Sequence, residues 1–161
     1  MPFLFRDASS MKLRKVLTTD CLRLNLPAAS KRAAIAEMLD ILIAAGKVRP
    51  ADRAAVLEAL LKREQKMSTG MQNGVAIPHA KCPQVDGLRA AVALKQEGLD
   101  FESLDGQPSR IFVMTVSPLK GSGPHIQFLA EISRIISEPG MRDRLLSAGS
   151  VSEVYTLLTQ G

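Results

Sequence analysis

The sequence predicts an α/β fold, a single domain in which helices and strands are interleaved around one mixed β-sheet. A chain of 161 residues has the length of one ordinary domain and can bury a full hydrophobic core. Its composition, 46% hydrophobic and 23% charged, is typical of a soluble globular protein. Segments with helical periodicity alternate with short β-branched runs, and no internal repeat or low-complexity segment interrupts them.

The first part of the chain is predicted to contain one strand and two helices. Residues 1–10 fit no element and are expected to form a flexible extension. The stretch LRLNLP, residues 22–27, alternates apolar and polar residues and predicts a short strand. An amphipathic helix follows, with Ser30 as its candidate N-cap and Gly46 as its stop. The same periodicity predicts a second helix from about 51 to 65.

The second part of the chain is predicted to contain a pair of strands and then helices. Residues 67–74 form a loop by composition, and 75–80 form a short extended piece that a proline interrupts. The β-branched or apolar runs 88–96 and 110–118 are bounded by turn signals and predict two strands. The segment between them contains an Asp-Gly turn dipeptide. Three helical segments complete the chain, with Pro124 suited to the first turn of the first one.

The charge of the chain does not indicate nucleic-acid binding. The net charge is +5, and the excess lies in residues 1–66, which hold 13 Lys and Arg against 7 Asp and Glu. Residues 67–161 hold 8 against 9. A nucleic-acid binder usually adds an Arg/Lys stripe, stacking aromatic residues or a helix-turn-helix pattern. None of these is present, so the basic residues are interpreted as a solvated face and no nucleic-acid partner is expected.

The cysteines and the N-terminus favour a cytoplasmic protein. Cys21 and Cys82 lie far apart in the sequence and are expected to be reduced thiols rather than a disulfide framework. The apolar run near the N-terminus has only four residues before Arg6, which is too short for a signal peptide. No later stretch reaches the length of a transmembrane helix, so no membrane span is expected.

Several enzyme classes are excluded by missing motifs. The sequence contains no GxxxxGK[ST], GxGxxG, HExxH or GxSxG pattern, which argues against P-loop kinases, Rossmann dehydrogenases and zinc peptidases. The only side chains from which a soft metal site could be built are His79, Cys82, His125 and Cys21, and no close CxxC-type pair supports such a site. We therefore expect no metal.

His79, in the stretch GVAIPHAK, is the residue that most needs an explanation. It follows a proline directly, and the chain has only one other histidine. On spacing alone, the more common interpretation is a structural loop histidine. The alternative is a nucleophile for phosphoryl transfer, since imidazole can attack phosphorus and later act as leaving group. Such a reaction also needs fixed donors for the phosphoryl oxygens, which nearby Arg, Ser, Thr and loop N–H groups can supply.

A longer stretch around His79 points to a known family. REQKMSTGMQNGVAIPHAK, residues 63–81, closely resembles the active-site signature of the type-2 enzyme IIA (fructose/mannitol) family of the bacterial phosphoenolpyruvate-dependent phosphotransferase system. Residues 11–26, 98–118 and 124–139 resemble the opening, the middle hairpin and the second-histidine helix of that family. The resemblance predicts a family domain over 11–161 and leaves only residues 1–10 outside it.

The resemblance implies a fold and a set of site residues. The fold would be a mixed sheet of about four to five strands with helices on both faces. His79 would be the phosphorylated nucleophile, and it would accept the phosphoryl group from phospho-HPr or its nitrogen-branch counterpart. Arg63 would stabilise the phosphoryl oxygens and His125 would donate an auxiliary hydrogen bond to the phosphoryl group. Thr69 and Ser68 would be weaker phosphoryl-binding candidates. No metal or cofactor enters this scheme.

The resemblance leaves the next step open among three functions. The first is a regulatory protein whose partners read its phosphorylation state, as in the nitrogen-regulatory branch; the wording NGVAIPHAK and the lack of a fused IIB or IIC segment favour it. The second is a sugar-uptake enzyme IIA that passes the group to an enzyme IIB cysteine. The third is a binding module with the same fold that is never phosphorylated.

Two further expectations concern the surroundings of the site. Glu64 is expected to be a helix-surface residue or to orient the neighbouring arginine. Partner proteins are expected to dock on a shallow apolar surface formed in part by Met67, Met71, Val75 or Ile77, because methionine suits a surface that must accept more than one partner.

Overall fold

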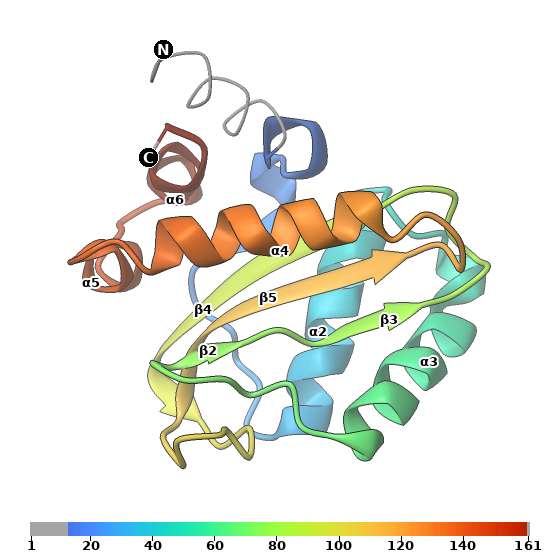
Figure 1. The fold of residues 1–161 in the computed structure, drawn as a ribbon, viewed down its shortest axis with the longest axis horizontal. Helices are drawn as coiled ribbons and strands as arrows, with labels where there is room; N and C mark the ends of the chain where they lie inside the picture. Colours follow the sequence, from blue (N-terminus) through green and yellow to red (C-terminus); the bar gives the residue numbers. More distant parts are fainter. Residues whose placement is uncertain (1–12, 161) are drawn as a thin grey trace.

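A mixed β-sheet forms the centre of the molecule (Figure 1). The computed structural model describes residues 13–160, and within them the sheet has five strands in the order β1-β4-β5-β2, with β3 also paired to β5. β4 and β5 are antiparallel, and the other three pairs are parallel. The strands are β1 (Leu22–Arg23), β2 (Val75–Ala76), β3 (His79–Lys81), β4 (Arg89–Leu99) and β5 (Ser109–Ser117). The predicted mixed sheet is therefore confirmed.

Helices cover both faces of this sheet. α2 and α3 pack on one face, and α4, α5 and α6 pack on the other (Figure 1). Each face has its own hydrophobic core cluster. The longer helices are α2 (Lys31–Ala44), α3 (Arg53–Lys66), α4 (Gly123–Ile136), α5 (Met141–Leu146) and α6 (Val151–Gln160). Residues 13–16 are also helical, and short 3-10 turns lie at Thr19–Cys21 and Pro50–Asp52.

The alternation of side chains along β5 separates the two cores. Phe112, Met114 and Val116 belong to the cluster beneath α2 and α3. Ile111 and Val113 belong to the cluster beneath α4, α5 and α6. Successive residues of a strand point to opposite faces, so nearly every residue of this central strand is buried. The position of each β5 side chain therefore decides which helix layer it meets.

The predicted ends of α2 are confirmed, whereas the first strand is shorter than predicted. The Ser30 hydroxyl accepts a hydrogen bond from Ala33 N–H at 3.2 Å, and Gly46 follows the helix with φ of 74°. The predicted strand 22–27 pairs with β4 only through Leu22 and Arg23. The chain then leaves the ladder and returns to β4 with a single hydrogen bond, from Leu26 N–H to Leu94 O at 2.9 Å. The next residue is a proline, which has no N–H with which to continue the pairing.

β4 is longer than predicted because it continues through an irregularity. The regular pairing with β5 ends at Leu94 and resumes at Leu99, and Gly98 in between has φ of 80°. A positive φ costs glycine little, so the strand accommodates the extra residues there. The predicted extension 1–10 lies outside the described residues. Within residues 13–160, no helix is both long and apolar enough to cross a membrane.

Candidate functional site

The loop between α3 and β2 folds back along β2 as a tight hairpin. Met71 N–H donates to Val75 O at 2.8 Å, and Ile77 N–H donates to Thr69 O at 3.0 Å. Asn73 and Gly74 form the turn, with φ of 63° and 76°. Two consecutive positive φ values are the geometry of a type I′ turn, which Asn-Gly adopts most readily. The signature loop therefore has a defined conformation rather than an open one.

His79 opens β3 directly after a break in the edge of the sheet. β2 and β3 both pair in parallel with β5, and the proline before His79 separates them. The register places His79 opposite Thr115, and the Thr115 N–H donates to Pro78 O at 3.1 Å. Partners in register point to the same face, and Thr115 shares its face of β5 with Ile111 and Val113, which lie four and two residues before it. His79 consequently lies on the face that α4 covers.

A backbone carbonyl determines which nitrogen of His79 carries the proton. Nδ1 of the partly buried ring lies 2.9 Å from Ile77 O. A carbonyl oxygen can only accept, so Nδ1 carries the hydrogen, and in the neutral ring Nε2 keeps a free lone pair. This is the tautomer that a nucleophile at Nε2 requires.

α4 brings the second histidine to the same place. His125 lies in the first turn of α4, and its ring centre is 5.5 Å from that of His79, with the planes inclined by 40°. The Nδ1 atom of His125 lies 3.2 Å from Thr115 Oγ1. The pKa of His125 is lowered from its ordinary value, mainly because burial disfavours the charged ring and further because of the positive charges of His79 and Lys81. His125 is therefore neutral near pH 7.

Arg63 lies in the last turn of α3, a helix that packs against β3. Its Nη1 donates to Met67 O at 2.8 Å, which closes the end of the helix. Within the described part of the chain, no hydrogen bond joins Arg63 to either imidazole. The remaining N–H groups of the guanidinium stay available.

The hydroxyl groups of Ser68 and Thr69 both have partners inside the protein. Ser68 Oγ donates to Phe101 O at 2.6 Å and accepts from Gly70 N–H at 3.1 Å. Thr69 Oγ1 donates to the carboxylate of Glu64. A direct bond from either hydroxyl to a phosphoryl oxygen would require that hydroxyl to leave its present acceptor, so phosphoryl binding by these two residues stays a prediction.

Glu64 was expected at the helix surface or beside the arginine, and that expectation is wrong. Its side chain is buried, and the carboxylate accepts from Thr69 N–H at 2.7 Å and pairs with Lys31 Nζ at 2.9 Å. The spacing offered a signal, because Val56, Leu60 and Glu64 recur every four residues and form the buried stripe of α3. A carboxylate at the end of such a stripe indicates a buried partner.

Thr115 and Lys81 were not identified from the sequence. The period of two along 110–118 places Thr115 on the same face as Ile111 and Val113, which is a usable signal for a polar residue aimed at a helix. Its place beside both histidines depends on the register between β3 and β5, which no local pattern reveals. Lys81 follows His79 by two residues and shares its face for the same reason.

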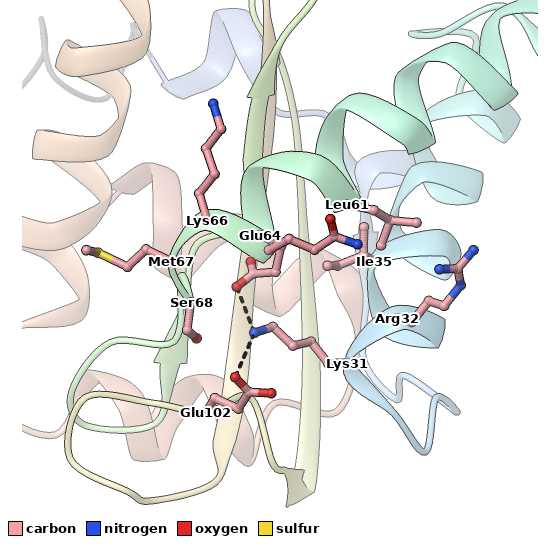
Figure 2. A pocket seen from close by; sticks show the side chains of 10 residues that line it. Lys31, Arg32, Ile35, Leu61, Glu64, Lys66, Met67, Ser68 and Glu102 are labelled. Carbon is pink, nitrogen blue, oxygen red and sulfur yellow. Dashed lines mark ion pairs between the residues drawn. The ribbon is translucent and has the colours of Figure 1, made fainter.

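A pocket beside the signature loop is not lined by either histidine. Its volume is about 510 Å³, and it opens between the start of α2 and the end of α3. Figure 2 shows Lys31 at its centre between Glu64 and Glu102, with Met67 extending away from this ion pair. Within residues 13–160, no three His, Cys, Asp or Glu side chains are grouped as a metal site would need.

Large apolar side chains are exposed in the segments that lead to the site residues. Met67, Leu119 and Ile126 are 68%, 60% and 61% exposed, and Ile126 follows His125 directly. Of the residues expected to form a docking surface, Met67 and Met71 are exposed. Val75 and Ile77 instead pack partly against the core beneath α4.

Comparison with known proteins identifies the family. The family model described as "Phosphoenolpyruvate-dependent sugar phosphotransferase system, EIIA 2" matches residues 15–161. The fructose-specific EIIA component of Haloferax volcanii is 37% identical over 141 residues, which are 88% of this chain and 90% of that protein. The nitrogen regulatory protein of Escherichia coli is 31% identical over 153 residues, 94% of this chain and 91% of that one.

Longer relatives and solved structures agree with this match. The fructose-specific EIIABC component of Bacillus subtilis is 35% identical over 93% of this chain, but the chain spans only 23% of that protein. The crystal structure of the nitrogen regulatory protein IIA-Ntr from Neisseria meningitidis superimposes with a TM-score of 0.81 at 28% identity, covering 90% of this chain and 97% of that one. The chain belongs to the EIIA type 2 family of the phosphoenolpyruvate-dependent sugar phosphotransferase system.

Proposed function

We propose that this protein is a phosphohistidine carrier that accepts a phosphoryl group on Nε2 of His79 from a phospho-HPr-type donor protein. The observation that carries the proposal is the hydrogen bond from His79 Nδ1 to Ile77 O, which leaves Nε2 free and unprotonated. Family membership supports the same chemistry. No metal or nucleotide takes part in the proposed reaction.

In the transfer, one bond from phosphorus to nitrogen forms at His79 as another breaks at the donor. The Nε2 lone pair of His79 attacks phosphorus while the bond from phosphorus to the donor nitrogen breaks, and the donor nitrogen keeps that electron pair. The phosphorylated ring retains its proton on Nδ1 and becomes cationic. The Ile77 carbonyl faces that N–H and stabilises the cation. Attack by the next acceptor on phosphorus returns a neutral imidazole as leaving group.

His125 and Arg63 are proposed to stabilise the phosphoryl oxygens during transfer. If the Thr115 hydroxyl donates to His125 Nδ1, the neutral ring of His125 carries its hydrogen on Nε2 and can donate it to a phosphoryl oxygen. The Arg63 guanidinium, anchored at Met67 O, can offer its planar pair of remaining donors. Donors held in place before the reaction stabilise the developing charge most effectively.

The downstream role is proposed to be regulatory, with protein partners that read the phosphorylation state of His79. The relatives named as nitrogen regulatory proteins, which match over nearly the whole chain, support this role. The 37% identity to a fructose-specific EIIA component favours a second role, in which the group passes to an enzyme IIB cysteine. The exposed Ile126, which follows His125 directly, suits docking of either kind of partner.

Reconstituted phosphotransfer tests the proposal. The protein is incubated with radiolabelled phosphoenolpyruvate, enzyme I and HPr or its nitrogen-branch counterpart. We expect one phosphate per chain, labile in acid and stable in base, that is absent in His79→Ala. Absence of label in the native chain with both donors would refute the carrier function. Adding purified enzyme IIB then separates the two roles, because only a sugar-uptake protein should lose its label to the IIB cysteine.

A further inference from the structure

We propose that Glu64 is a positioning residue for His79, acting through the backbone of Thr69 and Ile77. The inference rests on the proposed function only in that His79 is the phosphorylated residue. It assigns to the buried carboxylate of α3 a role in selecting the reactive tautomer of an imidazole that it does not touch.

Hydrogen bonds connect the two residues without a gap. The Glu64 carboxylate accepts from Thr69 N–H at 2.7 Å, and the carbonyl oxygen of Thr69 accepts from Ile77 N–H at 3.0 Å. The carbonyl oxygen of Ile77 in turn accepts from His79 Nδ1 at 2.9 Å. Each intermediate residue uses one backbone group toward Glu64 and the other toward His79. A displacement of Thr69 is therefore passed on to the oxygen that orients the imidazole.

The hydrogen bonds between Thr69 and the Glu64 carboxylate are the strongest in this series. Glu64 is only 6% exposed, and its carboxylate receives both donors of Thr69 and the ammonium group of Lys31. Hydrogen bonds to an ionised acceptor are roughly twice as strong as neutral ones, and a buried charge that loses its donors is costly. The carboxylate therefore holds Thr69 in one place.

The loop is also held from the opposite side, which makes the position of Thr69 specific. Ser68 Oγ bonds to Phe101 O, and Leu104 N–H donates to Gly70 O at 3.1 Å. Thr69 lies between these two attachments. The carboxylate binds the N–H and the hydroxyl of Thr69, whereas Ile77 N–H binds only its carbonyl oxygen, so loss of Glu64 should rotate Thr69 between its fixed neighbours.

The position of Ile77 O matters because it chooses between two tautomers. When that oxygen faces Nδ1, the proton stays on Nδ1 and Nε2 is the nucleophile. When the oxygen moves away, the proton can transfer to Nε2, which then lacks a lone pair for attack on phosphorus. A small displacement of a reacting group can lower a rate by about 100-fold.

Two variants of Glu64 test the proposal. Glu64→Gln removes the charge, and Glu64→Asp keeps the charge and its attraction to Lys31 but withdraws the oxygens from Thr69 by one methylene. We expect the nitrogen-15 NMR shifts of His79 in both variants to show loss of the single Nδ1–H tautomer. Phosphoryl transfer should slow by about 10- to 100-fold at saturating donor, with little change in the donor concentration needed for half-saturation. If Glu64→Gln fails to fold, Glu64→Asp alone decides.

Glu102→Gln is the matched control. Glu102 lies 3.8 Å from the same Lys31 ammonium, but it is exposed and makes no bond to Thr69. This variant should leave both the tautomer and the rate of transfer unchanged. A folded Glu64 variant that keeps the native His79 tautomer and rate, even with a lower Tm, would overturn the proposal. The NMR measurement uses unphosphorylated protein, so its outcome is distinguishable from failure of the carrier function.

Discussion

Replacing Gly70 by alanine should loosen the signature loop from the segment that supports it. A Cβ atom at Gly70 would lie 2.8 Å from Phe101 O, 2.9 Å from Ser103 Cα and 2.7 Å from Ser103 Oγ. Two of these atoms belong to the backbone, so rotation of one flexible side chain cannot relieve the overlap. The backbone of Gly70 itself does not lie in the left-handed region, and the expected penalty is therefore steric.

The magnitude follows from the contacts that must move. Overpacking of this kind costs about 1–3 kcal/mol. If the loop shifts to relieve it, the Leu104 N–H to Gly70 O bond and the Ser68 to Phe101 bond lengthen, and each contributes about 1 kcal/mol. A net loss of about 2 kcal/mol in the free energy of unfolding corresponds to a Tm lower by about 4–8 °C for a chain of this size.

Urea and thermal unfolding followed by circular dichroism measure this effect, and Gly149→Ala is the matched control. Gly149 also avoids positive φ, and the nearest atom to its added Cβ would be Glu153 Oε2 at 3.9 Å, an ordinary contact. The control should be neutral or more stable by about 0.4–1 kcal/mol, because alanine restricts the unfolded chain. Equal stability of the two variants would show that the Phe101–Ser103 segment yields freely and that the loop is not held by close packing.

Three further outcomes are expected. The pKa of His125 is lowered from its ordinary 6.5, so the unfolded chain binds this proton more tightly than the folded chain does. The free energy of unfolding should therefore be highest above pH 6.5 and should fall as the pH drops through 6.5 toward the folded pKa. Urea titrations at several pH values should show a flatter decline in His125→Gln, and an identical decline in both proteins would contradict this reasoning. Arg63→Lys keeps a charge but loses the planar fork, so rapid-quench measurements should show phosphoryl transfer slowed by about 10²- to 10³-fold; a native rate would leave Arg63 only its role at the helix end. Ser30→Ala removes the N-cap of α2 and should cost about 1 kcal/mol in urea unfolding, a loss that Ser30→Asp should largely restore. If the alanine variant were as stable as the native chain, the cap would contribute nothing.

Much of the fold could be predicted because local signals and tertiary structure agree. Ser30 and Gly46 bracket α2 as their chemistry requires. The two apolar runs on either side of the Asp-Gly dipeptide were correctly predicted to be strands, and in the structure they pair with each other. These features depend on residues close together in sequence, and helix and turn preferences act at that range.

The arrangement of the site could be predicted only in part. The proline before His79 marked an unusual backbone, but the sequence could not reveal that β3 pairs with β5 and so places His79 opposite Thr115. The strand periodicity assigns faces and leaves the register open. The burial of Glu64 depends on Lys31, which lies on another helix, and a charged residue at a helix end is ordinarily solvated. Pairings between distant segments were the part that local reasoning missed.

The break between β2 and β3 also has a consequence for solubility. A long edge strand with free N–H and C=O groups can add a strand from another molecule and begin aggregation. Here the edge consists of pieces of two and three residues, and the hairpin loop bonds to the outer side of the first piece. Pro78 directs its carbonyl oxygen to Thr115 N–H in β5, whereas the outward N–H and carbonyl oxygen of Ile77 are already bonded to Thr69 O and His79 Nδ1. The hairpin loop and the His79 ring therefore occupy groups that an incoming strand would need, so His79 can lie at the border of the sheet without a strand edge long enough for self-association.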